Sequence, residues 1–429
     1  MSFHTSLRIS AVTTMIAASS LAAIIVSPSA AVASPVSTSD FVLSYSTTAE
    51  NLNGSGASMQ TVINALTGFV GAVTRSGVSL PDTANQSSCS EALPAGLSPV
   101  CFTDGDDNSP EWVPQGVTTS YDSSGTALSA SGSRIVVSWY DNCSSTDDAD
   151  STQGCTDTNK VSTDMYRSKG TRISLLDPLT LDYRNVILVE PFYNSYGNAS
   201  YKAVPVHAGG IAWYGNLLYV ADTDNGFRVF NMNQFFDMSK QQQSGYPTDY
   251  GDKTQMGRQS GTFYSFGYRF MLPQIGRWSQ ATTWNGSTCL GYGPLRFSNV
   301  GLDRSTSPAR LSVAEYCPTG NTTSRVARWN LSGSGLTNGT PADAYAHGLE
   351  RVQGVVTVGN TYYFNASNGG SYGTTHRFDY SSTAGTILST SSRTTAIGCE
   401  DLSYDGSSNR LYSVAEYYGK RVLYGLTRF

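Results

Sequence analysis

Short alternating runs of apolar and polar residues, separated by turn residues, make up most of the chain. The stretch HAGGIAWYGNLLYVADTDNGFRVFNM, from His207 to Met232, shows the pattern: short apolar runs alternate with turns rich in Gly, Asn and Asp. Runs of this length that contain Val, Tyr, Phe and Ile predict β-strands, and turns this short require antiparallel neighbours. The pattern predicts an all-β protein.

The same order of strands recurs along the chain. Each unit opens with QGV, GGI, SNV, QGV or EDL, continues with a second strand such as LLYVAD or RLSVAE, and has a third strand such as FRVF or RVARW. The openings lie at Gln115, Gly209, Ser298, Gln353 and Glu400, so the spacings are 94, 89, 55 and 47 residues. The shorter spacings are close to the length of a four-stranded propeller blade. We therefore predict a β-propeller of about five blades, with six or seven as alternatives; a pair of β-sandwiches would not explain the repeated motifs.

The ends of the repeat region indicate how the ring closes. The last unit ends at Phe429 with three strands, so we expect a strand from residues 37–80 to complete the last blade. ASMQTVINALTGFVGAV, in the same region, has the apolar spacing of a helix. RNVILVEP and YRFMLPQ predict fourth strands of the earlier units. The expected organisation is a signal peptide over 1–33, an amino-terminal extension with a disulfide-stapled loop over 34–107, and the propeller over 108–429.

The first residues have the order of a secretory signal peptide. Arg8 precedes an uncharged apolar run from Ile9 to Val26, and small residues follow at Ala31 and Ala33. A membrane anchor is the alternative, because this run is 18 residues long. Charged residues make up only 14% of the chain, and the net charge of −5 gives no reason to expect nucleic acid or an anionic membrane as partner. We expect a secreted, extracellular monomer without stable membrane insertion after signal removal.

The cysteines agree with an oxidising compartment. Cys89 with Cys101, and Cys143 with Cys155, are each separated by 12 residues in loop-like segments, and Cys289 with Cys317 is a plausible third bridge. Connectivity cannot be derived from the sequence alone. Cys399 would remain unpaired, and we expect it to be a small buried apolar residue rather than a reactive thiol.

An antiparallel meander brings the start of each first strand and the end of each second strand to one end of the ring, which we call the mouth. Positions two residues apart on a strand point the same way. The residues two before the openings therefore share a direction with them: they are Val113, His207, Arg296, Arg351 and Gly398. We expect His207 and Glu400 to be catalytic and Gln115, Arg296, Arg351 and Gln353 to bind substrate. The alternative for His207 is a hydrogen-bonded structural residue.

Two further groups of residues are candidates. The second strands end with Asp222, Glu315 and Glu416, and the third strands carry Arg228, Arg325 and Arg421. We expect these acidic residues to form repeated structural pairs with the arginines. The insertion after Met232 contains Arg258, Tyr268 and Arg269, and long insertions are often binding loops. We expect these three residues to contact substrate, with packing on the side of the barrel as the alternative.

The stretch CEDLSYDGSSNRLYSVAEY, which begins at Cys399, resembles the repeat of NHL and gluconolactonase-type propellers. More broadly, the chain resembles uncharacterised secreted propellers. In gluconolactonase-type propellers a Glu at the start of an inner strand binds a divalent metal. The resemblance therefore implies Glu400 as a ligand of a divalent cation such as calcium.

These features point to a secreted carbohydrate-active enzyme that acts on an extracellular polysaccharide or glycan. In a lyase, His207 or a Tyr would take a proton beside a uronate carboxylate, which Arg296 or Arg351 would neutralise. In a hydrolase, Glu400 and a second carboxylate would act as acid and base or nucleophile. A lectin-like or adhesive binding propeller without catalysis is the alternative, although the opening residues differ between units, which favours one central site.

Overall fold

The computed structural model describes residues 35–54, 56–80, 89, 93–142, 169–284, 286, 289–320, 323–333, 335–381 and 386–429. The expected signal peptide and the pair Cys143 and Cys155 lie outside these residues. Within them, no helix has both the length and the apolar character that a membrane span requires. Residues from Val32 onward belong to one compact unit.

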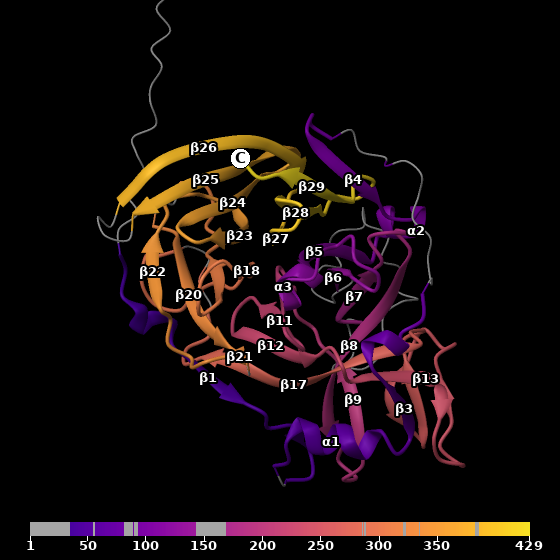
Figure 1. Ribbon diagram of the computed structural model, residues 1–429. Helices are drawn as coiled ribbons and strands as arrows, with labels where there is room; N and C mark the ends of the chain where they lie inside the picture. Colours follow the sequence, from indigo (N-terminus) through magenta and orange to yellow (C-terminus); the bar gives the residue numbers. More distant parts are fainter. Residues whose placement is uncertain are drawn as a thin grey trace, which may run out of the picture. The chain divides into compact units, whose positions relative to one another are not determined.

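Four-stranded antiparallel meanders follow one another along the chain (Figure 1). The first contains β5 (Trp112–Thr119), β6 (Ile135–Asp141), β7 (Thr171–Leu176) and β8 (Tyr183–Tyr193). The second contains β10 (Ile211–Tyr214), β11 (Leu217–Asp222), β12 (Gly226–Asn231) and β17 (Phe270–Gln280). The third contains β18 (Gly301–Asp303), β19 (Arg310–Ala314), β20 (Arg325–Ser332) and β22 (Asp343–Ala346), with a short β21 (Gly335–Leu336) beside β20. The fourth contains β23 (Val352–Val358), β24 (Thr361–Asn368), β25 (Ser371–Ser381) and β26 (Thr386–Ile397).

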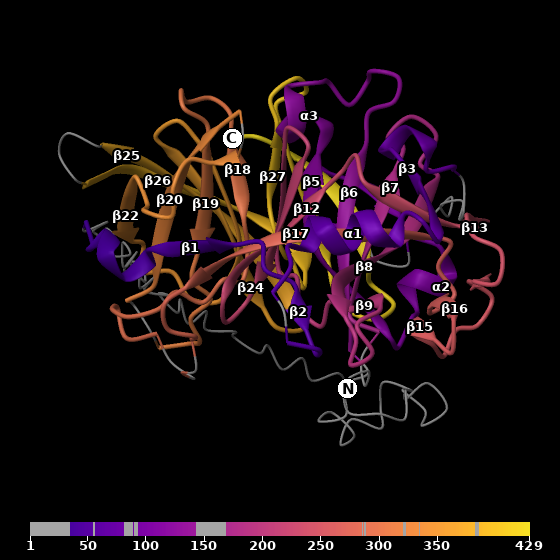
Figure 2. The same cartoon turned by 90° about the horizontal axis from the view of Figure 1, so that it is seen from below.

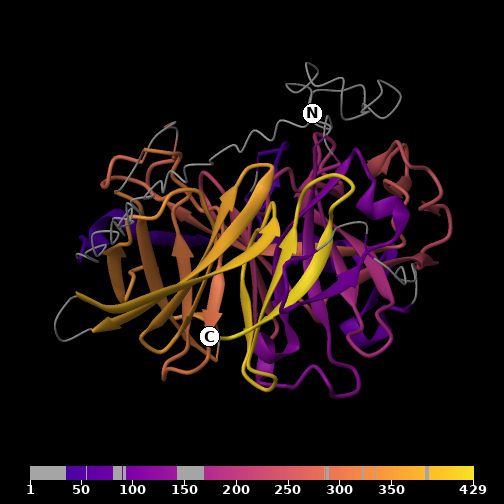
Figure 3. The same cartoon turned by 90° about the horizontal axis from the view of Figure 1, so that it is seen from above.

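The last meander is completed by a strand from the amino-terminal part of the chain. It contains β27 (Ser403–Asp405), β28 (Arg410–Ala415), β29 (Val422–Thr427) and β4 (Leu97–Cys101). Figure 3 shows the yellow carboxyl-terminal strands beside purple strands from early in the sequence. Closure by an early strand was predicted, but its source was wrong: β4 supplies it, whereas residues 37–80 supply other strands. β27 and β28 of this last meander contact β5 of the first, so the two ends of the ring meet there.

The innermost strands form a closed circuit of contacts. β5 contacts β10, β10 contacts β18, β18 contacts β23, β23 contacts β27, and β27 contacts β5. The predicted β-propeller class is therefore confirmed. The strands expected at RNVILVEP and YRFMLPQ are the outer strands β8 and β17. The blade number of the whole chain stays a prediction, since residues 143–168 lie between β6 and β7 outside the described part.

The remaining segments cover the outside of the first two blades. β1 (Leu43–Ser46) pairs with β17, β2 (Glu50–Asn51) and β9 (Ala199–Ala203) pair with β8, and β3 (Val70–Val73) pairs with β13 (Phe235–Gln241). The predicted helix is α1 (Met59–Leu66), whose buried face packs on β8 and β17. The insertion after Met232 also forms a small sheet of β14 (Thr248–Asp249), β15 (Met256–Gln259) and β16 (Thr262–Ser265). The short helical turns are Thr38–Phe41, Arg75–Gly77, α2 (Asp104–Asp107) and α3 (Ser120–Ser124).

The second residue of each opening lies where neighbouring blades approach most closely. A Cβ on Gly116 would lie 2.8 Å from the backbone nitrogen of Ile211, and a Cβ on Gly210 would collide with Val300. In the last unit this position is Asp401, which is fully buried. Its carboxylate accepts backbone N–H groups from three other blades, from Val117 (3.3 Å), Ile211 (3.0 Å) and Val300 (3.3 Å). Asp401 therefore joins the first strands around the axis.

Two of the expected disulfides are present, Cys89–Cys101 and Cys289–Cys317. Cys399 is an unpaired, fully buried thiol that packs with Ala396, Ala415 and Val422. Its expected role as a small buried apolar residue is therefore confirmed. The disulfide Cys89–Cys101 lies at the end of β4, so it fastens the loop that precedes the closing strand.

Candidate functional site

The strand pairing places the opening residues and the second-strand ends at one end of the ring. Just before two openings, Phe297 pairs with Glu315 and Cys399 pairs with Ala415. β5 leads away from this mouth toward α3, which lies at the other end of the strands (Figure 2). The alignment of the units made from the sequence is therefore reproduced in space.

Two carboxyl groups, those of Glu400 and Glu416, lie together at the mouth. Gln353 Nε2 donates to Glu400 Oε1 (3.1 Å), and Gln115 Nε2 donates to Glu416 Oε2 (2.9 Å). Glu400 is fully buried and its Oε2 has no donor partner among the described residues. A hydrogen bond between the two carboxyls requires that one of them carries a proton. Two glutamines thus hold a carboxyl pair that can share one proton.

Burial and mutual repulsion make this shared proton favourable. Burial raises the pKa of Glu400 well above its ordinary value, and the charge of Glu416 acts in the same direction. Burial also raises the pKa of Glu416. Like charges this close cannot both ionise without a large penalty, so the pair titrates as one unit. The pair therefore keeps a proton to higher pH than an isolated carboxyl does, which suits a proton donor.

Glu416 departs from a pattern that the other blades follow. Asp222 pairs with Arg228 (2.7 Å), and Glu315 binds Arg325 through two side-chain hydrogen bonds (2.9 and 2.5 Å). Arg421, by contrast, donates its Nε–H to the backbone oxygen of Glu416 (2.9 Å) and not to the carboxylate. The expected structural pairs are confirmed for Asp222 and Glu315. For Glu416 the expectation was wrong, since its carboxylate bonds to Gln115.

Gly398 makes room for this carboxyl pair. It has φ of 64°, in the left-handed region, and a Cβ here would lie 3.1 Å from Cγ of Glu416. The equivalent positions of other units carry His207, Arg296 and Arg351. The missing side chain in the last unit thus lets Glu416 reach the pair.

His207 lies at the mouth with an exposed side chain, stacked on Tyr140 from the end of β6, with ring centroids 4.2 Å apart. Although His207 is exposed at its outer edge, the protein atoms packed around the ring partly desolvate the imidazole and lower its pKa to about 4, and the positive charge of Arg296 acts in the same direction. Both causes favour the neutral ring at pH 7. A neutral, accessible imidazole can accept a proton.

Arg296 is held between aromatic rings. Its guanidinium lies over Trp284 (4.7 Å) and Tyr316 (4.8 Å), and its Nε has no hydrogen-bond partner among the described residues. Tyr316 in turn interacts electrostatically with Tyr417, which interacts with both members of the carboxyl pair. Electrostatic interactions therefore link Arg296 to His207 and, through Tyr316 and Tyr417, to the pair.

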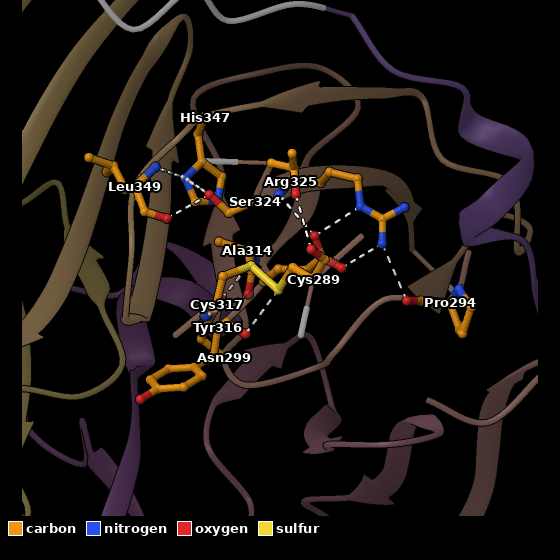
Figure 4. Close-up of a disulfide and its surroundings, with 12 residues drawn as sticks. Cys289, Pro294, Asn299, Ala314, Tyr316, Cys317, Ser324, Arg325, His347 and Leu349 are labelled. Atoms are coloured by element: carbon orange, nitrogen blue, oxygen red, sulfur yellow. Dashed lines mark hydrogen bonds and ion pairs between the residues drawn. A yellow bond between two sulfur atoms is a disulfide. The ribbon is translucent and has the colours of Figure 1, made fainter. Parts of the chain in front are cut away.

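The predicted metal ligand Glu400 has few companions that would suit calcium. Calcium takes six to eight oxygen ligands, whereas both carboxylates of the pair accept amide N–H groups. A second group of potential ligands, Cys289, Glu315 and Cys317, has its ligand atoms within 4.8 Å of one another, and Figure 4 shows the two cysteines joined by their disulfide. Its two sulfurs are joined in a disulfide and Glu315 is bound to Arg325. The second group therefore offers no free set of ligands in this state, whereas a divalent cation at Glu400 stays a prediction.

The other predicted binding residues are not joined to the pair by any interaction within the described part. Arg351 has φ of 52° and donates to Asn368 (3.2 Å). Tyr268 accepts a hydrogen bond from Arg172 (3.3 Å), and Arg269 forms a two-point ion pair with Asp237 (2.9 and 3.0 Å). Arg258 stacks on Tyr246 and Phe263 of the insertion and on Phe69, which lies between α1 and β3. These contacts give Tyr268 and Arg269 structural roles and leave Gln115, Gln353, His207 and Arg296 at the site.

Several residues of the site were not singled out from the sequence. Tyr140, Trp284 and Tyr316 flank His207 and Arg296, but aromatic residues are frequent throughout the chain. A signal for Asp401 was present in the sequence: it is the single acidic residue among the second residues of the openings, which are otherwise Gly116, Gly210, Asn299 and Gly354.

No family model and no curated protein matches the chain. The likeness to NHL and gluconolactonase-type propellers therefore finds no support. Among solved structures, RS223 β-xylosidase is 9% identical with a TM-score of 0.30, over 74% of this chain and 93% of that chain. An α-L-arabinofuranosidase from Clostridium thermocellum ATCC 27405 is 10% identical with a TM-score of 0.32, over 71% and 82%. The β-propeller domain of Cps50 (Swd1) from Myceliophteria thermophila is 8% identical with a TM-score of 0.27, over 59% and 89%. At such low scores, we infer neither activity nor substrate from these likenesses.

Proposed function

We propose that this protein is a secreted polysaccharide lyase that cleaves uronate-containing glycans by β-elimination. The observation that carries the proposal is the neutral, exposed His207 beside the Arg296 guanidinium, at the same mouth as the proton-sharing Glu400–Glu416 pair. Elimination beside a carboxylate needs a base, a cation for the carboxylate and an acid for the leaving oxygen. The mouth offers one candidate of each kind.

The roles follow from the charges and the exposure of these groups. Arg296 binds the uronate carboxylate and stabilises the negative charge that develops when the adjacent carbon loses its proton. An imidazole nitrogen of His207 takes that proton. The electron pair left behind forms the new carbon–carbon double bond as the glycosidic carbon–oxygen bond breaks. The carboxyl pair then donates its proton to the leaving oxygen, with Glu416, the more exposed partner, facing the substrate. No oxidant, reductant or metal is needed.

Hydrolysis is the second candidate. Glycoside hydrolases hold their two carboxyls about 5 Å or more apart so that the scissile bond lies between them. The Glu400–Glu416 pair is a single hydrogen-bonded unit, so it supplies one of these groups and not both. Asp224 is the candidate for the second group. It is an exposed residue, and partial desolvation of its carboxylate together with the charge of Asp222 raises its pKa. A hydrolase would therefore use Asp224 with Glu416.

The mature protein should be incubated with neutral and uronate-containing polysaccharides, with and without calcium, while ultraviolet absorbance of unsaturated uronates and new reducing ends are followed. We expect absorbance from a uronate polymer in either condition, and a loss of about a hundredfold or more in His207→Ala and Arg296→Gln. Reducing ends without absorbance, lost in Asp224→Asn, would instead establish a hydrolase. Retention on a glycan column without cleavage would establish a binding module.

A further inference from the structure

A polar cavity lies on the outer rim of the first blade. Its volume is about 550 Å³, within the range of small-molecule sites. Three segments meet there: the residue after β2, the turn between β8 and β9, and the turn between β15 and β16. The lining residues are Leu52, Phe192, Asn194, Ser195, Tyr196, Asn198, Ser200, Arg258, Gln259, Ser260 and Gly261.

The cavity is on the mouth side of the ring. In an antiparallel meander the fourth strand ends on the same side as the second, so the end of β8 at Tyr193 is on the side of Tyr140. In Figure 2, the labels of β2, β9 and β15 lie on the opposite side from α3, which follows the far end of β5. A long polymer bound at the mouth can therefore extend toward this rim.

Hydrogen bonds hold the walls of the cavity in place. Asn194 Oδ1 accepts the backbone N–H groups of Tyr196 (3.1 Å) and Asn198 (3.0 Å), which shapes the β8–β9 turn. Ser200 Oγ accepts the backbone N–H of Arg258 (3.0 Å), which joins that turn to the insertion. The leucine at the third wall, Leu52, donates its N–H to the oxygen of Tyr193 (3.0 Å). The cavity is thus built by contacts between three distant parts of the chain.

Arg258 provides the positive charge of this cavity. Its guanidinium lies over Phe69 (5.1 Å), Tyr246 (4.9 Å) and Phe263 (5.6 Å), which fixes its position. Within the described part of the chain, no carboxylate forms an ion pair with it. A guanidinium positioned by aromatic rings keeps its N–H donors for a carboxylate in the ligand.

The other lining residues suit a sugar. Tyr196 is 85% exposed, so its ring is available to stack on the face of a pyranose. The amides and hydroxyls of Asn198, Gln259 and Ser260 offer donors and acceptors to sugar hydroxyls. We infer that this cavity is an ancillary binding site for uronate-containing oligosaccharides, in which Arg258 binds a carboxylate and Tyr196 stacks on a ring. The choice of a uronate rests on the proposed function.

The test is calorimetric titration of a uronate hexamer and of its carboxyl-reduced, neutral counterpart into the full mature chain. All proteins carry His207→Ala so that no cleavage occurs. We expect Arg258→Gln and Tyr196→Ala each to weaken hexamer binding by about five- to tenfold in affinity. If the parent protein shows two binding events, we expect each substitution to remove one of them. Tyr250→Ala, an exposed tyrosine of the same insertion outside the cavity lining, is the matched control.

Because Tyr196 is largely exposed, its substitution tests the site even if Arg258→Gln disturbs the aromatic packing. Equal hexamer binding by the parent protein, Tyr196→Ala and Arg258→Gln would overturn the inference, as would equal binding of the neutral hexamer. If the hexamer binds through Arg258 and Tyr196 but the wild-type protein eliminates no uronate polymer, the cavity stands and the proposed function fails.

Discussion

At the scale of single residues, the account depends on the protonation of His207. Its pKa is lowered to about 4, because the surrounding atoms desolvate the imidazole and Arg296 repels its charged form. The neutral base is therefore present from pH 7 down to about pH 5 and is lost as the pH falls through 4. We expect kcat/KM of the wild type to stay level over the upper range and to decline only near pH 4.

A pH profile of kcat/KM on a uronate polymer measures this directly. Arg296→Gln removes the repelling charge, so the acid limb of its residual activity should move to higher pH. A wild-type limb near the ordinary histidine value of 6.5, unmoved in Arg296→Gln, would contradict the assignment.

The carboxyl pair predicts a second residue-scale effect, on stability. Folding raises the pKa of Glu400 and of Glu416, so the folded state retains protons that the unfolded state releases. The resulting stabilisation is present at low pH and is lost as the pH rises through the folded-state pKa values. We expect the stability of Glu400→Gln relative to the wild type to increase as the pH rises from 5 to 8, because the variant has no carboxyl to ionise at this position.

Urea unfolding at the two pH values measures this difference. Glu350→Gln, at a partly exposed carboxylate of another loop, is the control and should behave alike at both. If the difference in stability between Glu400→Gln and the wild type is the same at pH 5 and at pH 8, the two carboxyls do not share a proton.

At the scale of elements, the repeated acid–arginine contacts fasten neighbouring strands. Glu315 ends the second strand and Arg325 begins the third, and each side chain is only 1% exposed. Removing one partner leaves a buried charge, so we expect Arg325→Leu to lower the free energy of unfolding by about 3–5 kcal/mol.

The double variant Glu315→Leu with Arg325→Leu leaves neither charge unpaired and should recover most of this loss. Urea unfolding of the two variants measures the difference. Equal losses in both would show that packing, and not the unpaired charge, accounts for the effect.

The closing strand β4 gives a second prediction at this scale. β4 pairs with β29 and ends at the Cys89–Cys101 disulfide. Replacing both cysteines with serine increases the conformational entropy of the unfolded chain, so we expect the free energy of unfolding to fall by about 2–4 kcal/mol. Hydrogen exchange should also become faster at the amides of β29. Unchanged exchange in β29 would mean that the disulfide does not hold the closing strand.

The prediction from sequence succeeded where the pattern was periodic. The opening motifs at Gly209 and Glu400, the third strands and the early-strand closure all follow from alternation and turn residues, which are local. The source of the closing strand was missed, because Leu97–Cys101 carries a proline and little alternation. The strand is defined by its pairing with β29, which is non-local.

The site was predicted in part for the same reason. Glu400 was detectable as an exception in its aligned column, and His207 because its column also carries Arg296 and Arg351. The role of Glu416 was not, because Glu416 and Arg421 repeat the spacing of pairs that are structural in other blades. The structure shows two features that the sequence does not: Gly398 packs against Glu416, and Arg421 donates to backbone oxygens. The carboxylate of Glu416 is therefore not bound by Arg421.

At the scale of the whole molecule, the ring has a filled axis, and the proposed catalytic groups lie at one end of it. Asp401 and the glycines of the openings bring the first strands into close contact around the axis. No open channel therefore runs along the axis past these residues. The groups for chemistry gather at the mouth, and the ancillary cavity lies on the same side. This arrangement suits a long polymer lying across one end of the ring.

In the proposed reaction the bond is broken by elimination and not by water. The most direct measurement is mass spectrometry of the products made from a uronate polymer in water labelled with heavy oxygen. Elimination leaves a double bond and incorporates no label at the cleavage, whereas hydrolysis incorporates one labelled oxygen for each bond broken. We predict unlabelled, unsaturated products from the wild type and none from His207→Ala; labelled, saturated products would contradict the account.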